Sequence, residues 1–167
     1  MTTANETPRQ ILWRLIKDIK FSMFTTVGSN GDMRAAPMTT QNTDLDENDT
    51  LWFFMSRKDD VVADIGSHPN VNVSYADKGD DCYVSVSGIA SVVEDMAKKN
   101  HLWNSFAQAW FPGGVDDPEL ALVQVKIIHA HYWDVKESKM IQLFKIAKAS
   151  LTGEKVEKMG QVGEVTM

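Results

Sequence analysis

Short apolar segments joined by tight turns constrain the fold of this chain most. Residues 21–27 and 33–40 are two such segments, and Asn30-Gly31 between them supplies the positive φ angles that tight hairpins need. Residues 71–75 alternate apolar and polar side chains, as a half-buried strand does. Links this short join antiparallel strands, because parallel strands need a crossover of about a dozen or more residues. The pattern therefore predicts a mainly β fold with an antiparallel sheet.

The other elements are predicted from apolar spacing and from helix and turn residues. Further strands are expected at residues 50–55, 83–93, 123–132 and 140–144, with a bulge at Gly88. Helices are expected from Thr7 and Pro8 to residue 19, in a short segment that ends near Gly66, and at residues 95–110. We therefore expect a helix-decorated antiparallel barrel over residues 1–144, followed by a partly helical or disordered tail over residues 145–167.

The composition limits the classes of function. The 167 residues carry 17 basic and 23 acidic side chains, a net charge of −6, and form no basic stripe, so nucleic-acid binding is not expected. The densest apolar cluster, residues 51–55, is too short to span a membrane, and the first residues lack the pattern of a secretory signal. The sequence thus predicts one soluble domain in the cytoplasm, with no membrane partner.

No pattern of nucleophilic or metal chemistry stands out. Cys82, the single cysteine, has no histidine near it in the sequence, and neither a Gly-x-Ser-x-Gly elbow nor a dinucleotide-binding glycine pattern occurs. His129 and His131 lie two apart on a predicted strand and so share one face. Two ligands do not make a metal site and no third follows in an evident pattern, so no metal is expected and no catalytic residue is assigned.

Two segments carry features of an anion-binding site. One strand combines the cation of Arg34 with Pro37, which lacks a backbone donor and belongs on an edge or irregular strand. Ser56, Arg57 and Lys58 precede a predicted helix, whose free amides and dipole favour an anion. A phosphate cradle is one interpretation and a capped helix with solvated charges is the other. The residues alone leave both open.

Six segments in order also resemble a known family. They are MRAAPM at residues 33–38, LWFFMSR at 51–57, HPNVNVSY at 68–75, VSGIA at 86–90, AWFPGGVDDP at 109–118 and YWD at 132–134. In this order they resemble bacterial general stress proteins of the pyridoxamine 5'-phosphate oxidase-like group, over roughly residues 11–144. The segment at 109–118 is the most diagnostic of the six.

The resemblance implies an FMN-binding split barrel that forms a homodimer and holds two flavins at the subunit interface, with FAD as the alternative cofactor. By position, the residues beside the isoalloxazine and phosphate would be Arg34, Ala35, Ala36, Pro37, Met38 and Thr39. The neighbouring strand would add Phe54, Met55 and Ser56, and the phosphate would face Arg57 and Lys58. The partner subunit would close the pocket with Trp133, Trp110 and Phe111.

This chain departs from the family at two positions of the implied site. The family often has threonine where this chain has Met55, and a phosphate-binding lysine where this chain has Val61. Lys58 lies three residues before Val61, on a nearby helical surface, and would be its substitute. Without such a substitute, phosphate affinity would be weakened.

Three functions are consistent with these residues. The first is a flavin-dependent oxidoreductase of stress physiology, with a reduced nicotinamide or another small molecule as redox partner and an unknown substrate. The second is a non-catalytic flavin carrier, redox sensor or partner-binding module. The third, an interaction protein without a cofactor, is preferred if Val61 has removed the phosphate site. In the larger family that this chain resembles, oxidation of pyridoxamine phosphate relies on a C-terminal segment that contains arginine and histidine. This chain has neither residue after Trp133, so that activity is not expected.

Overall fold

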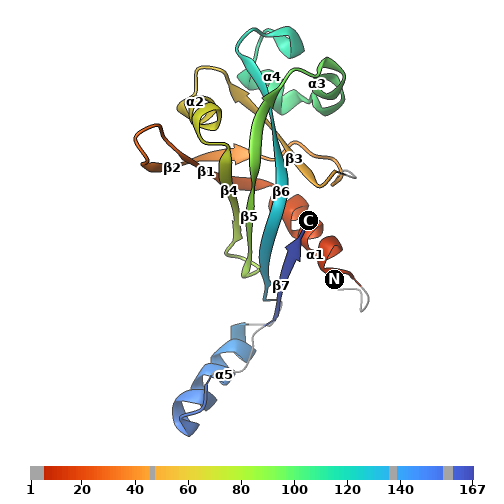
Figure 1. The fold of residues 1–167 in the computed structure, drawn as a ribbon. Coiled ribbons are helices and arrows are strands. Elements are labelled where there is room, and N and C mark those ends of the chain that lie inside the picture. Colours follow the sequence, from red (N-terminus) through yellow and green to blue (C-terminus); the bar gives the residue numbers. More distant parts are fainter. Residues whose placement is uncertain (1–5, 46–47, 136–138, 156–159) are drawn as a thin grey trace.

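The longest strand of the chain, β6 (Leu120–Asp134), is the spine of one antiparallel sheet (Figure 1). The computed structural model describes residues 6–45, 48–135, 139–155 and 160–167. Over these residues the strands pair in the order β2-β1-β4-β5-β6-β3, and β7 also pairs with β6. The other strands are β1 (Phe21–Val27), β2 (Met33–Thr39), β3 (Thr50–Ser56), β4 (Asn70–Asp77), β5 (Cys82–Val93) and β7 (Gln161–Thr166). The sheet curls into a half-barrel, as the sequence predicted.

Helices cover the sheet and its ends. Figure 1 shows α1 beside the sheet, α2 near the ends of β1 and β4, α3 and α4 at one end of β6, and α5 projecting beyond the other end. Their bounds are α1 (Pro8–Ile19), α2 (Asp60–Ser67), α3 (Met96–Leu102), α4 (Ser105–Trp110) and α5 (Lys139–Thr152), with a short 3-10 turn at Gly114–Asp116. No described helix has the length and apolar character needed to cross a membrane.

The core lies between α1 and the inner face of the sheet. Thr7 caps α1 through a reciprocal pair of hydrogen bonds with Gln10, and Pro8 occupies the first turn, as the sequence predicted. The buried face of α1 carries Ile11, Leu12, Leu15 and Ile16. Phe24 and Phe53 meet edge to face inside the sheet, with ring centroids 5.2 Å apart. Burying these side chains is the main stabilisation of the fold.

Several local predictions are confirmed. Gly31 in the β1–β2 hairpin has φ +86°, and Pro37 lies on β2, which pairs only with β1 among the described strands. The β5–β6 register shifts between Ser87 and Gly88, where the bulge was expected. Cys82 is buried, and its thiol donates to a carboxylate oxygen of Asp134 (3.4 Å). It is a packed cysteine.

Two predictions about elements are wrong, and a third is incomplete. Residues 140–144 lie in α5 and not in a strand, because a short apolar run has no period of its own and these residues sit among good helix formers. The single helix expected at 95–110 is divided into α3 and α4, because Asn104 is extended and its side chain accepts a hydrogen bond from the amide of Ala107 (3.0 Å). The tail at residues 145–167 is helical in part, as predicted, because α5 extends to Thr152, but it also contains strand β7, which was not predicted.

Replacing Gly88 with alanine should lower the free energy of unfolding by about 1–3 kcal/mol, as overpacking does. A Cβ at Gly88 would lie 2.5 Å from the carbonyl oxygen of Lys126 and 2.7 Å from Cγ1 of Val125. The matched control is Gly66→Ala in α2, where nothing lies within 4 Å of the added atom and alanine favours the helix by up to about 1 kcal/mol. Urea denaturation measures both. A Gly88→Ala protein as stable as the original would contradict the close approach of β5 and β6.

Candidate functional site

Arg34 is the expected site cation that the structure fixes most firmly. It lies on β2 opposite Thr26, and its guanidinium contacts two carboxylates of α2, Asp60 at 3.1 Å and Asp64 at 3.0 Å. Asp64 is buried and also accepts a hydrogen bond from the hydroxyl of Thr26 (2.8 Å). Asp60 is exposed. The guanidinium is therefore held from the interior by one carboxylate and touched from the solvent side by another.

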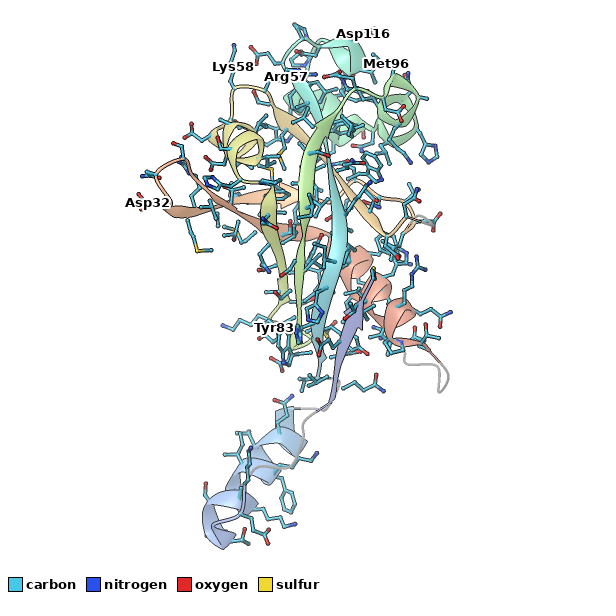
Figure 2. All side chains as sticks on the ribbon, viewed as in Figure 1. Asp32, Arg57, Lys58, Tyr83, Met96 and Asp116 are labelled. Carbon is cyan, nitrogen blue, oxygen red and sulfur yellow. The ribbon has the colours of Figure 1, made fainter. Side chains whose placement is uncertain are left out.

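The β3–α2 link brings the other two expected cations to glutamates. Arg57 pairs with Glu94, and Lys58 pairs with Glu119. The hydrogen bond from Arg57 lowers the pKa of Glu94, and the hydrogen bond to Glu119 raises the pKa of Lys58. Arg34, Arg57 and Lys58 thus each have carboxylate partners of their own, on three different segments. Figure 2 shows Arg57 and Lys58 at the end of the molecule near α3.

The link before α2 is held by hydrogen bonds of its own, and the side chain of Asp59 at the N-cap does not cap the helix. The amide of Ser56 donates to the carboxylate of Asp59 (3.2 Å), and the amide of Lys58 donates to the hydroxyl of Ser56 (3.3 Å). Val61, where the resemblance implied a lysine, is buried in the core, so this position supplies no cation to the surface. The cations that the sequence assigned to a phosphate near α2 are therefore Arg34, Arg57 and Lys58.

The remaining expected residues of β2 and β3 divide between the two faces of the sheet. Ala35 and Pro37 are exposed, whereas Ala36 and Met38 pack partly against the core. The carbonyl of Thr39 accepts a hydrogen bond from the side chain of Gln41 (3.1 Å). On β3, Met55 is buried in the core, and the ring of Phe54 meets that of Trp103 edge to face at 5.6 Å. The side chain of Met55 thus faces the barrel interior.

The three expected aromatic residues lie at opposite ends of β6. Trp110 is exposed at the end of α4 and Phe111 follows it, half-buried. Trp133 pairs with Tyr83 of β5, whereas Ser56 pairs with Leu120 at the beginning of β6. At ~3.3 Å per residue, positions 120 and 133 are about 40 Å apart along the strand. Figure 2 shows Lys58 and Tyr83, the neighbour of Trp133 on β5, toward opposite ends of the sheet.

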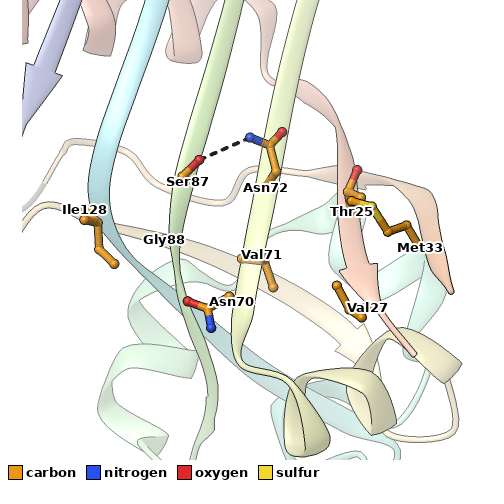
Figure 3. Close-up of a pocket in the computed structure, with 9 residues that line it drawn as sticks. All are labelled: Thr25, Val27, Met33, Asn70, Val71, Asn72, Ser87, Gly88 and Ile128. Atoms are coloured by element: carbon orange, nitrogen blue, oxygen red, sulfur yellow. Dashed lines mark hydrogen bonds between the residues drawn. The ribbon is translucent and has the colours of Figure 1, made fainter. Parts of the chain in front are cut away.

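A pocket of about 250 Å³ opens on the outer face of the sheet (Figure 3). The side chain of Asn72 crosses from β4 to β5 and donates to the hydroxyl of Ser85 (2.9 Å) and, more weakly, to that of Ser87 (3.5 Å). The lining residues are Thr25, Val27, Met33, Asn70, Val71, Asn72, Ser87, Gly88 and Ile128. Met33 places this pocket next to Arg34 in the chain, although their side chains leave opposite faces of β2.

Sequence reasoning missed the pocket and the carboxylates beside Arg34. The signal for the pocket was the polar residues at alternate positions of β4 and β5, Asn72, Ser85 and Ser87, which place small polar side chains at this point of the outer face. Asp64 gave no signal, because a lone acid within the short apolar pattern of a helix usually faces solvent.

Comparison with known proteins places this geometry in context. The family model described as pyridoxamine 5'-phosphate oxidase-like matches residues 7–157. A crystal structure of a general stress protein 26 from Jannaschia sp. CCS1 is 25% identical and covers 93% of this chain and 96% of that chain, with a TM-score of 0.72. The crystal structure of the general stress FMN/FAD-binding protein of Xanthomonas citri is 32% identical to this chain, with a TM-score of 0.66. The match covers 76% of this chain and 87% of the Xanthomonas citri chain. The protein bli-3 of Neurospora crassa is 28% identical in an alignment of 156 residues that covers 87% of this chain and 74% of bli-3.

Replacing Asp64 with asparagine should lower the free energy of unfolding by about 1–3 kcal/mol, because Arg34 and Thr26 both lose a charged, buried acceptor. Asp60→Asn is the matched control. Its pair with Arg34 is exposed, so its loss should cost less than about 1 kcal/mol. Equal destabilisation of the two variants in urea denaturation would show that Asp64 does not anchor the guanidinium.

Proposed function

This chain belongs to the pyridoxamine 5'-phosphate oxidase-like family, and from that premise we propose that it binds a flavin between two copies of itself. The Xanthomonas citri relative is an FMN/FAD-binding protein, which supports the choice of ligand. FMN is the proposed form, because its terminal phosphate is a dianion that suits an arginine.

The setting of Arg34 is the observation that carries this proposal. Asp64 holds the guanidinium from the buried side, and the outer partner, Asp60, has a side chain that is 82% exposed. An exposed ion pair contributes only about 0–1 kcal/mol, whereas a phosphate binds arginine through charge-assisted, often bidentate, hydrogen bonds. A phosphate can therefore replace Asp60 at a guanidinium that is already in position. Arg57 and Lys58, with exposed glutamate partners, are the candidates for further contacts.

The outer face of the sheet offers walls for the flavin ring. Val27, Met33 and Ile128 give the pocket apolar sides, which a planar ring requires. Its volume of about 250 Å³ is smaller than the ~300–1,000 Å³ of pockets that enclose a whole ligand. The proposal therefore has a second copy cover the rest of the ring. Trp133 is its proposed contribution, because in its own chain this residue lies at the far end of β6 from the cations.

The proposed activity is that of an oxidoreductase. A bound flavin supplies the transfer of reducing equivalents. This chain's residues would bind the phosphate at Arg34, orient the ring along the outer face and exclude water from it. A small-molecule donor such as a reduced nicotinamide is the proposed redox partner.

One observation favours a second candidate, a flavin carrier without turnover. The polar residues that line the described pocket are Thr25, Asn70, Asn72 and Ser87, none of which exchanges a proton near neutral pH. A site without an acid or base suits storage or sensing of a flavin as well as hydride transfer to it.

Replacing Asp60 with asparagine should tighten FMN binding by about 2–5-fold, because the carboxylate that competes with the phosphate is removed. The effect is small because an exposed ion pair contributes less than about 1 kcal/mol. Arg34→Lys should weaken it by about 10-fold or more, since a bidentate, charge-assisted contact is lost. Quenching of FMN fluorescence measures the affinity, and sedimentation should find the flavin-bound species to be a dimer. Asp80→Asn, in the β4–β5 turn, controls for net charge. If neither Arg34→Lys nor Asp60→Asn changes the affinity for FMN, the phosphate does not bind at Arg34.

Turnover separates the oxidoreductase from the carrier. With excess reduced nicotinamide and oxygen, an oxidoreductase should consume many equivalents of nicotinamide for each bound flavin. Absorbance at the nicotinamide band measures this. Consumption that stops at one equivalent, with the flavin still bound, would favour the carrier.

A further inference from the structure

Three donor atoms converge between β6 and β7, and none of the three residues that carry them belongs to the proposed flavin site. Nε2 of His129 lies 2.7 Å from Nε2 of His131 and 2.9 Å from Oε1 of Glu164. Nε2 of His131 lies 3.8 Å from the same oxygen. Two imidazole nitrogens and one carboxylate oxygen thus share a space the size of one coordination sphere.

The antiparallel register explains why these side chains meet. His129 and His131 are two apart on β6, so they leave the same face of the sheet. On β7, Glu164 lies directly opposite His131, and Thr166 lies directly opposite His129. Side chains opposite each other in an antiparallel pair are close neighbours on one face. The two hydrogen-bonded backbones therefore fix all three ligand positions.

Hydrogen bonds alone cannot pair all three of these donor atoms well. A ring nitrogen of a neutral histidine either donates one hydrogen or accepts one, in a single direction in the plane of the ring. A hydrogen on Nε2 of His129 can point at His131 or at Glu164, but it cannot serve both contacts well. A cation among the three atoms would accept a lone pair from each of them.

We propose that His129, His131 and Glu164 form a binding site for a divalent metal ion of the zinc class. Two imidazoles and one carboxylate are a donor set that Zn²⁺ accepts, with a fourth position left for water or another ligand. The side chains are partly exposed, so that position faces solvent. Nitrogen donors also select Zn²⁺ over Mg²⁺ and Ca²⁺, which prefer oxygen.

Two neighbouring side chains, Thr166 and Trp133, contact the rings of the histidines. Nδ1 of His129 lies 3.2 Å from the hydroxyl of Thr166, which can hold the ring with Nε2 toward the ion. The ring of Trp133 stacks on that of His131, with centroids 6.0 Å apart and planes at 19°. Trp133 thus limits the rotation of the second imidazole and lies close enough to report on an ion.

The sequence argued against a metal here because no third ligand followed the two histidines in an evident pattern. Glu164 supplies that ligand from β7, the strand that the sequence did not predict. A metal at this place would also join β7 to β6 through side chains, in addition to the backbone ladder. The inference does not depend on flavin binding.

The test is a Zn²⁺ titration of the full chain, freed of metal with EDTA and of flavin by dialysis, in competition with a chromophoric chelator. One Zn²⁺ per chain is expected. Glu164→Gln and His131→Gln should each weaken binding by more than about 10-fold, and Thr166→Val by about 10-fold, as loss of an outer partner does. Mg²⁺ at the same concentration should not compete. Co²⁺ should quench tryptophan fluorescence, and most of that quenching should disappear in Trp133→Phe.

The controls are His101→Gln on α3 and His68→Gln after α2, which change exposed histidines elsewhere and should leave the affinity unchanged. Circular dichroism confirms that each variant is folded. Absence of Zn²⁺ binding by the folded original chain would overturn the proposal. So would Zn²⁺ binding that survives Glu164→Gln and Thr166→Val, or that falls equally in the two controls, because such binding belongs to surface histidines in general.

Discussion

Strand β6 shares its backbone hydrogen bonds with three neighbours, and the rest of the structure depends on this sharing. One edge of β6 pairs with β5 over residues 122–134. The other edge pairs first with β3, over residues 120–126, and then with β7, over residues 129–134. Because buried backbone groups must find partners, this arrangement fixes which elements lie at each end of the strand. It places the loop of Arg57 and Lys58 at one end and Trp133 with the two histidines at the other.

The charges around α2 explain how the proposed phosphate site fits an acidic chain. The net charge of −6 is distributed so that Arg34, Arg57 and Lys58 each meet a carboxylate, and among these contacts the one between Arg34 and Asp64 reaches the interior. In the proposed site, a phosphate would therefore compete with exposed carboxylates of the protein, such as Asp60, for the same cations. Val61 is buried in the core and adds no cation that would favour the ligand.

The sequence predicted those parts of the fold that depend on near neighbours in the chain. Thr7 with Pro8, Asn30 with Gly31, and Gly88 each act over a few residues, through capping, positive φ or close approach. The break at Asn104 had a local signal in its capping side chain, but the apolar spacing of residues 95–110 concealed it. The short apolar run at 140–144 fits a strand or a helix equally well.

The parts that escaped prediction depend on partners far along the chain. Strand β7 has weak apolar character of its own and is ordered by the free edge of β6. Arg34 was identified as a site cation, but its anchor, Asp64, is 30 positions away and becomes a partner only once α2 packs on β1 and β2. Glu164 meets His131 only through the β6–β7 register. None of these pairings has a period or a spacing that a single sequence can display.

The short strand β7 also has a consequence for the behaviour of the protein in concentrated solution. Where β3 leaves β6, six residues of a long strand would otherwise present open amides and carbonyls, and such an edge readily recruits strands from other molecules. Strand β7 covers that edge and is itself brief, with Glu164 in its middle, so the new edge is charged and short. The end of the sheet is thereby protected from edge-to-edge aggregation by a segment that adds little to the core.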